Sequence, residues 1–202
     1  MIQRQGQFFS IATQRTVYCF QVTEQGFLQH LHYGRKIDLS AGWQALVPQV
    51  RHFPGNAAVL DGTCLEDTAL EVSFPGLGDL RESFAEVETS DGSPADLRFV
   101  QAEILPEKPP LEGLPSAAGG GETLEITLAD RQHGLELVLR YTAFDDCDVI
   151  TRQTLLTNTG IRPVIVRRLM SNQVDFCSQD YLFTTFNGAW AREFEPKDTP
   201  CG

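Results

Sequence analysis

Positive charge is scarce in this sequence. Its 202 residues include 16 lysines and arginines against 27 aspartates and glutamates, so the formal net charge is −11. Nucleic acids and anionic membranes repel a surface of that sign, and proteins that bind them normally carry a basic patch. We therefore expect no nucleic acid and no membrane among the partners of this protein.

Long apolar runs and closely paired cysteines are also missing. No run approaches the roughly 18 residues that suggest a membrane span, and residues 1–20 lack the basic and apolar regions of a signal peptide. The 5 cysteines are dispersed without a C-x-x-C pair, which is typical of reduced thiols rather than of a disulfide framework. These absences predict a cytoplasmic protein.

Signatures of self-sufficient catalysis are absent as well. The glycine-rich stretch 119–122 has no phosphate-binding pattern around it, and no G-x-S-x-G occurs. His30 and His32 are close enough to chelate a metal, but no further ligand is near in sequence, and a pair of partly exposed strand histidines is the plainer interpretation. The carboxylates of residues 145–148 indicate a solvated turn. We assign no catalytic residue, no metal and no cofactor.

Alternation of apolar and polar residues is the strongest pattern that is present. In residues 122–144 it runs on both sides of the turn sequence DRQHG, as in an antiparallel hairpin with one buried face. Together with repeated turn signals, such alternation predicts an all-β antiparallel sandwich. Four strand pairs are expected, in residues 15–37, 85–105, 122–144 and 148–176.

Helical signal is thin. Residues 66–74 could make one or two helical turns. The Gly- and Pro-containing stretches 40–62 and 73–85, and the irregular stretch 106–122, are expected to be long loops, which in compact domains are often functional.

Aromatic and arginine side chains gather in some of the irregular segments. Arg51 and Phe53 lie in VPQVRHFPGN, and Trp190 and Arg192 lie in GAWARE. Aromatic faces that stack on sugar rings, beside polar groups that fix hydroxyls, are the usual form of a carbohydrate site. The four residues are therefore the candidate substrate-binding residues, and the alternative is that they pin long loops to the sandwich.

The order of several segments is more specific than any one of them. GFLQHLHYGRKI, LPEKPPLEGLPSA, the run ETLEITLADRQHGLELVLRYTAFDDCDVITRQTLLTNTG, and SNQVDFCSQDYLFTTFNGAWARE follow one another along the chain. This series resembles the N-terminal β-domain of family 36 glycoside hydrolases, the bacterial and fungal α-galactosidases, from about residue 7 to 196. The resemblance implies a galactose-mutarotase-like β-supersandwich that precedes a catalytic (β/α)8 barrel.

What the resemblance implies for function is a supporting role. The family's catalytic aspartates lie on the barrel, and residues 1–202 are expected to end before the barrel and before the supersandwich is complete, so the chain alone is expected to be inactive. Its implied partners are its own downstream barrel, neighbouring subunits of a homo-oligomer and α-galactoside sugars. A sandwich cut there leaves an unpaired edge, which predicts association of the isolated chain.

Two alternatives stay open from the residues alone. The aromatic and arginine loops also suit a stand-alone carbohydrate-binding β-sandwich. His30, His32 and the cysteines suit, less well, a small metal or redox protein.

Overall fold

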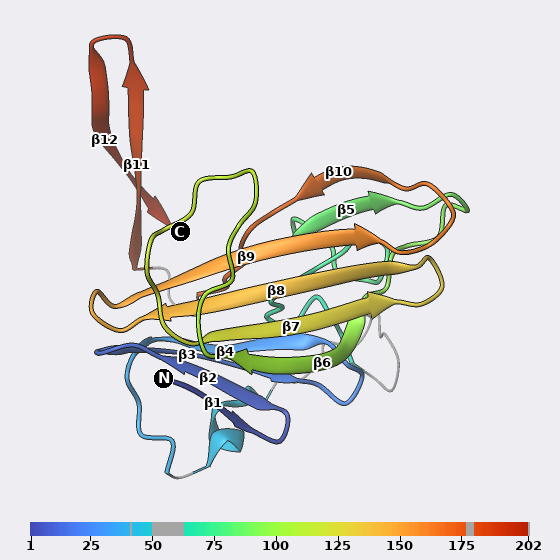
Figure 1. Ribbon diagram of the computed structural model, residues 1–202, viewed down its shortest axis with the longest axis horizontal. Helices are drawn as coiled ribbons and strands as arrows, with labels where there is room; N and C mark the ends of the chain where they lie inside the picture. The colour runs from blue at the N-terminus through green and yellow to red at the C-terminus, as the bar shows by residue number, and fades with distance from the viewer. Residues whose placement is uncertain (41, 50–62, 177–179, 202) are drawn as a thin grey trace.

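The computed structural model describes residues 1–40, 42–49, 63–176 and 180–201. Its body is a sandwich of two antiparallel sheets, one over the other in Figure 1. The first sheet has the order β1-β2-β3-β4, with the strands Ile2–Gln5, Phe8–Ala12, Thr16–Val22 and Leu28–Arg35. The second sheet has the order β6-β7-β8-β9, with the strands Arg98–Leu105, Thr123–Asp130, Leu135–Phe144 and Val149–Asn158. The predicted all-β antiparallel class is confirmed.

The core lies between the two sheets and is built from alternate residues. From Leu135 to Leu139, every second side chain of β8 is buried and the intervening ones are half-buried. Phe9 and Phe20 meet this face from the first sheet, and their ring centroids are 5.2 Å apart. The Phe20 ring also stacks on Tyr141 of β8 at 5.3 Å. Each such buried aromatic side chain contributes on the order of 1.5–3 kcal/mol to stability.

Two of the predicted strand pairs are confirmed. Residues 15–37 form β3 and β4, which pair from Thr16 with Arg35 to Val22 with Leu28. Residues 122–144 form β7 and β8, which pair continuously through the turn DRQHG. In both cases the turn is short and the two apolar faces match, so the local pattern was sufficient to set the pairing.

The other two predicted pairings are wrong. The strands β5 (Ala85–Glu88) and β10 (Ile165–Leu169) pair with each other, while β6 pairs with β7 and β9 pairs with β8. The chain does turn after each expected strand, but the next strand joins a different partner. The pairing of β5 with β10 places the Ala85 and Val87 side chains in the core, although the two strands are distant in the sequence. The β8–β9 ladder ends at Asn158, and Pro163, which has no backbone N–H, lies between it and β10.

One expected helical segment is not a helix, and one expected loop contains a short helix. Residues 66–74 form no helix, and Leu70 instead makes an isolated bridge to Gln29 of β4. A short 3-10 helix, Trp43–Leu46, lies in the first expected loop, where the buried Trp43 ring packs edge-on against Phe8. The described part of the chain contains no helix with the length and apolar character needed to cross a membrane.

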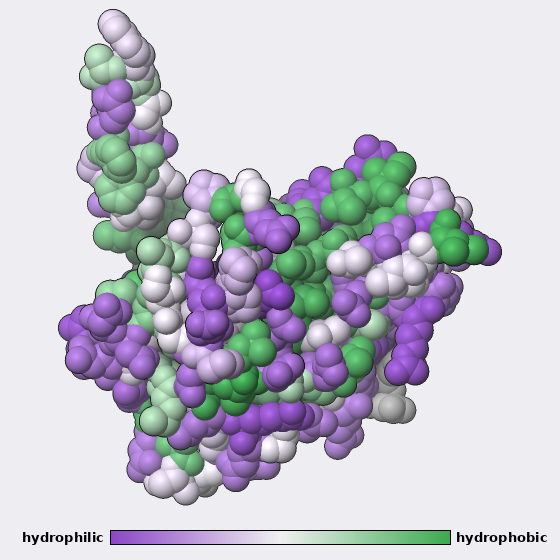
Figure 2. Space-filling model, viewed as in Figure 1, coloured by the Kyte–Doolittle hydropathy of each residue, from purple (hydrophilic) through white to green (hydrophobic). Residues whose placement is uncertain are grey.

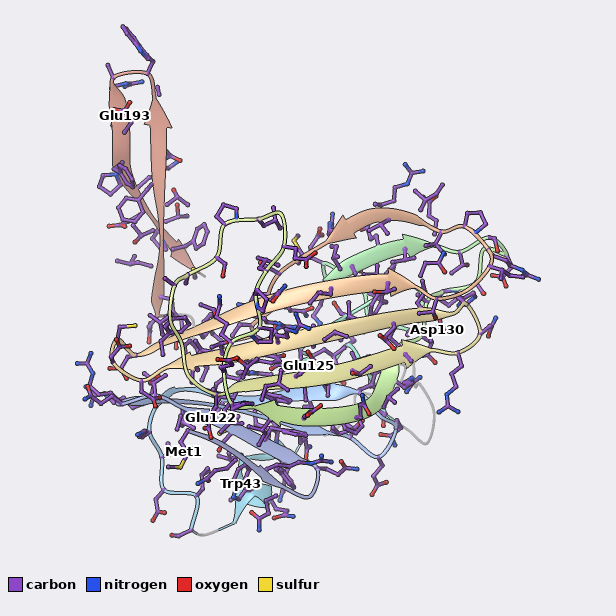
Figure 3. All side chains as sticks on the ribbon, viewed as in Figure 1. Met1, Trp43, Glu122, Glu125, Asp130 and Glu193 are labelled. Carbon is purple, nitrogen blue, oxygen red and sulfur yellow. The ribbon has the colours of Figure 1, made fainter. Side chains whose placement is uncertain are left out.

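A two-stranded hairpin stands off the sandwich and is the most unusual feature of the fold (Figure 1). Its strands are β11 (Tyr181–Ala189) and β12 (Arg192–Cys201), and we call residues 181–201 the arm. Figure 3 labels Glu193 near the tip of the arm and Asp130 at the distant end of the sandwich, where β7 turns into β8. The arm and that turn therefore present separate surfaces.

Candidate functional site

The arm is a continuous antiparallel ribbon with almost no covering. Tyr181 pairs with Cys201 at its base and Ala189 pairs with Arg192 at its tip. Nearly every residue along both strands is exposed. An isolated two-stranded ribbon is marginally stable in water, because it has no third strand or helix to cover its side chains.

Apolar side chains are unusually frequent on this uncovered ribbon. Trp190 at the tip is 96% exposed and Phe194 is 82% exposed. Leu182, Phe183 and Phe186 are exposed as well. Figure 2 shows the corresponding green apolar surface along the arm. A set of exposed aromatic residues on one projection marks a surface that meets another protein or a ligand.

The backbone near the tip adopts conformations that non-glycine residues seldom use. Ala191 and Phe194 have φ angles of 61° and 59°. The register shifts here, because two residues of β12 lie opposite Gly188 alone. A left-handed conformation costs a non-glycine residue roughly 1–2 kcal/mol, and it directs Phe194 onto Phe186, whose ring centroid is 6.4 Å away. Such strain is common at binding sites.

The predicted binding residues fall into two groups. Trp190 and Arg192 both lie at the tip of the arm, where the Arg192 guanidinium is 4.0 Å from the Glu195 carboxylate and remains largely exposed. Arg51 and Phe53 lie outside the described residues. The structure therefore places two of the four candidate residues together on one surface.

Arg81, in the expected loop 73–85, has a structural role. Its guanidinium donates to both carboxylate oxygens of Asp79 at 2.9 Å, to Asp175 at 3.2 Å, and to the carbonyl oxygens of Leu65 and Thr68 at 3.1 and 2.7 Å. This side chain joins three irregular segments, so the interpretation as a loop anchor applies to it.

A buried ionic cluster around Glu71 was not predicted. The Glu71 carboxylate is fully buried and accepts hydrogen bonds from the Tyr18 and Tyr141 hydroxyls, each at 2.7 Å. Nδ1 of His30 lies 2.9 Å from it, and a guanidinium nitrogen of Arg152 lies 3.3 Å away. Tyr18 and His30 belong to the first sheet and Tyr141 and Arg152 to the second, so the cluster joins both sheets to the segment that carries Glu71.

The protonation states in this cluster follow from its contacts. Burial alone would raise the pKa of Glu71, but the hydrogen bond with His30 and the charge of Arg152 outweigh it, and the pKa lies below its usual value. Burial raises the pKa of Tyr18 and Tyr141 well above that of a free phenol. Glu71 is thus a carboxylate held by two neutral phenols.

The cluster has the groups of an acid–base site, but a substrate cannot reach them. The neighbouring cavity has a volume of only about 80 Å³, whereas sites for small organic ligands are typically about 300–1,000 Å³. We therefore assign the cluster a role in stability. The cluster also gives His30 a structural partner, because its Nδ1 bonds to Glu71. The described residues contain no group of three or more side chains that could hold a metal ion.

A second polar network, around His133, holds the β7–β8 turn to the loop after β5. His133 Nδ1 is 2.6 Å from Oδ2 of Asp130, and Nε2 is 2.8 Å from Oγ of Ser93. The order resembles a Ser–His–Asp triad. However, Ser93 Oγ already donates to Asp91 Oδ1 at 2.6 Å, and the hydrogen bond to Asp130 raises the pKa of His133. The hydroxyl proton is directed to Asp91 rather than to His133, so the network lacks the serine-to-histidine hydrogen bond of a nucleophile–base pair.

This network predicts a pH-dependent contribution to stability. The pKa of His133 is raised, so its contribution to the free energy of unfolding is complete below about pH 6 and is lost at higher pH. The pKa of Asp130 is lowered, so its contribution is complete above about pH 4 and is lost at lower pH. We expect His133→Gln to reduce the free energy of unfolding most near pH 5 and much less at pH 9, measured by urea denaturation. His32→Gln, on the neighbouring sheet, is the matched control. An equal loss from His133→Gln at both pH values would contradict the assignment.

The fold and these sites define a class of protein: an all-β module with a sealed ionic centre and an exposed aromatic arm. Comparison with known proteins identifies the family. The model of the glycosyl hydrolase family 36 N-terminal domain matches residues 26–202, and the chain belongs to this family. The resemblance inferred from the order of the sequence segments is confirmed.

Relatives of known identity cover nearly all of this chain. The α-galactosidase AgaA of Geobacillus stearothermophilus is 34% identical over 192 residues, which are 92% of this chain and 26% of that protein. The bifunctional α-galactosidase/sucrose kinase AgaSK of Mediterraneibacter gnavus is 35% identical over 202 residues, 96% of this chain and 21% of that protein. The chain thus spans about a quarter or less of the length of the curated relatives it matches.

Solved structures show the same fold. The galactosidase domain of AgaSK superimposes with a TM-score of 0.88 at 31% identity, covering 100% of this chain and 29% of that one. The α-galactosidase from Lactobacillus brevis gives a TM-score of 0.87 at 27% identity, covering 96% of this chain and 27% of that one. Both likenesses extend over the sandwich and most or all of the remaining chain.

Proposed function

We propose that residues 1–202 are the N-terminal, non-catalytic β-supersandwich region of an α-galactosidase, and that the catalytic (β/α)8 barrel follows them in the complete enzyme. The observation that carries this proposal is the combination of a family match over residues 26–202 with an alignment to only about a quarter of each relative. The parent enzyme would hydrolyse terminal α-galactosyl groups with retention, using aspartates of the barrel.

Three of the described carboxylates have contacts that point to a structural role. Glu71 is sealed in the core, Asp130 is bonded to His133, and Asp148 is bonded to Arg15 and Thr13. Each is held by donors that stabilise the fold. The proposed role of this region is to support the barrel, the oligomer contacts and the substrate pocket.

The arm is the proposed contact with those partners. The proposed substrate-pocket residues are Trp190 and Arg192 at its tip, together with Arg51 and Phe53. We propose that a neighbouring subunit of a homo-oligomer covers the arm. A double-substituted variant of one relative, AgaA, has been solved in complex with raffinose, which supports α-galactosides as the substrate class here. The exposed aromatic side chains suit such a contact because they lose little conformational freedom on binding.

We further propose a cytoplasmic location. All four described cysteines, Cys19, Cys64, Cys147 and Cys201, are free thiols. Two of them are exposed and would be prone to oxidation in an oxidising compartment.

The experiment that tests this function uses the purified 202-residue chain. We expect no turnover of an aryl α-galactoside, and concentration-dependent association in light scattering. Trp190→Ser with Phe194→Ser should weaken association about tenfold or more, because large exposed aromatic residues dominate such contacts. Leu80→Ser is the matched control, since Leu80 is 83% exposed but lies on the sandwich body.

Several outcomes would contradict the proposal. Turnover by this chain would place the chemistry within it rather than downstream. Equal association of the arm variant and the Leu80 variant would remove the arm from the interface. Saturable heat with galactose, melibiose or raffinose by a monomeric chain would favour the alternative, a stand-alone carbohydrate-binding module.

A further inference from the structure

A hollow at the end of the sandwich is formed by three connections: the loop after β5, the β7–β8 turn, and the segment between β9 and β10. Its volume is about 440 Å³, which is within the typical range of about 300–1,000 Å³ for small-ligand sites. We propose that this hollow binds the phosphate monoester of a small polyol, with Arg131 and Arg162 as the groups that hold the phosphate. The proposal does not depend on the proposed function.

The two arginines that line the hollow are available for a ligand. Neither guanidinium has a hydrogen bond or carboxylate partner among the described residues, whereas Arg15, Arg98 and Arg140 are all ion-paired. In a protein with a net charge of −11, two unpaired arginines that line the same hollow give it a local positive charge. Guanidinium groups bind phosphate oxygens through paired N–H donors, which makes phosphate the matching chemistry.

The carboxylates near the hollow are already satisfied. Asp130 Oδ1 accepts from the backbone N–H groups of Gln132 and His133, at 2.9 and 3.0 Å, and Oδ2 faces His133 Nδ1 at 2.6 Å. Asp91 Oδ1 accepts from the backbone N–H and the hydroxyl of Ser93, at 3.1 and 2.6 Å. Both carboxylates face His133 in addition to these donors, so the Arg131 and Arg162 guanidinium groups remain free to attract an anion.

The floor of the hollow is preformed by two glycines in direct contact. The carbonyl oxygen of Gly134 accepts from the backbone N–H groups of Thr159 and Gly160, at 2.7 and 3.0 Å. A Cβ atom on Gly134 would lie 2.6 Å from Cα of Gly160, and one on Gly160 would lie 2.8 Å from the carbonyl oxygen of His133. The fixed floor lowers the ordering cost of binding.

Hydroxyl and amide groups on the remaining wall suit the polyol part of the ligand. Thr89, Ser90 and Gln132 line the hollow beside the arginines. The Ser90 hydroxyl has no hydrogen-bond partner among the described residues, so it is available to a sugar hydroxyl. A phosphate alone would leave most of the volume unused, whereas a hexose phosphate fills a space of this size.

The test is calorimetric titration of the full chain with a hexose 6-phosphate at pH 7. We expect one saturable site, about tenfold or more weakened in Arg131→Gln with Arg162→Gln, because each lost charge-assisted contact costs a factor of several in affinity. Arg35→Gln removes an exposed positive charge from β4 that has no ion-pair partner among the described residues, and this variant should bind like the parent. Circular dichroism confirms that each variant is folded, and single variants replace the double one if it is not.

Each result decides the proposal. No saturable heat at millimolar hexose phosphate, equal binding by the parent and the double variant, or an equal loss in Arg35→Gln would overturn it. Inorganic phosphate should bind at least several-fold more weakly than the hexose phosphate, and equal binding would remove the polyol from the site. The unphosphorylated hexose should not compete, and competition by it would remove the phosphate from the recognition.

Discussion

Replacing Glu71 with glutamine is expected to cost about 3–5 kcal/mol of folding stability, because it leaves the buried Arg152 guanidinium without a carboxylate partner. Arg152 is only 6% exposed, and in addition to its contact with the carboxylate it donates to the carbonyl oxygen of Glu71 at 2.7 Å. The substitution preserves the volume of the side chain, so the loss comes from charge rather than from packing. Urea denaturation of the two proteins at pH 7 measures the difference.

A surface pair provides the control for this experiment. Glu125 bonds to Arg140 at 2.7 Å, and both side chains are 22% exposed. Glu125→Gln is expected to cost about 1 kcal/mol or less, since water compensates for a partly exposed pair. Removing Arg152 as well, by Arg152→Met in the Glu71→Gln background, should restore part of the lost stability. If Glu71→Gln costs no more than Glu125→Gln, the cluster does not hold the sheets together.

Gly134→Ala is expected to lower stability by about 2–4 kcal/mol, which combines backbone strain with a direct clash. Gly134 has a φ angle of +67°, and its added Cβ atom would lie 2.7 Å from the backbone nitrogen of Gly160 as well as close to its Cα. Backbone atoms cannot rotate away as a side chain could. The β7–β8 turn or the β9–β10 segment must therefore shift, and thermal unfolding should record the loss.

Substitution of Gly92 separates the effect of backbone strain from that of the steric clash. It has a φ angle of +75°, but nothing lies within 4 Å of its added Cβ. Gly92→Ala should therefore show the left-handed strain alone, roughly 1–2 kcal/mol. Equal losses at the two positions would mean that the contact between Gly134 and Gly160 is not tight, and the preformed floor of the hollow would lose its support.

The sequence carried more of the fold than of the function. Local alternation was enough for the two hairpins 15–37 and 122–144, because a short turn and two matching apolar faces leave one register. It was not enough for β5 and β10, whose partners lie about 80 residues apart in the chain, as the pairing of Val87 with Val166 shows. Pairing over that separation depends on which edges and which core faces remain free after the other strands have formed.

The candidate site shows the same division. Trp190 and Arg192 were predicted as a pair because GAWARE is a local feature of the sequence, and they do lie together at the tip of the arm. That the arm projects without cover could not be read from its residues, since its aromatic content equally suits a buried strand. Exposure is a property of what surrounds a segment, and here only the three-dimensional arrangement shows it.

The sequence by itself determined the class of fold, the net negative charge and, through the order of its segments, the family. Only the tertiary structure decided that Glu71 meets His30 and Arg152, and that Arg131 and Arg162 share one hollow. The physical reason is the same in both cases. These side chains lie about 30 to 80 residues apart in the sequence, and no periodicity records which distant side chains will meet when the sheets close.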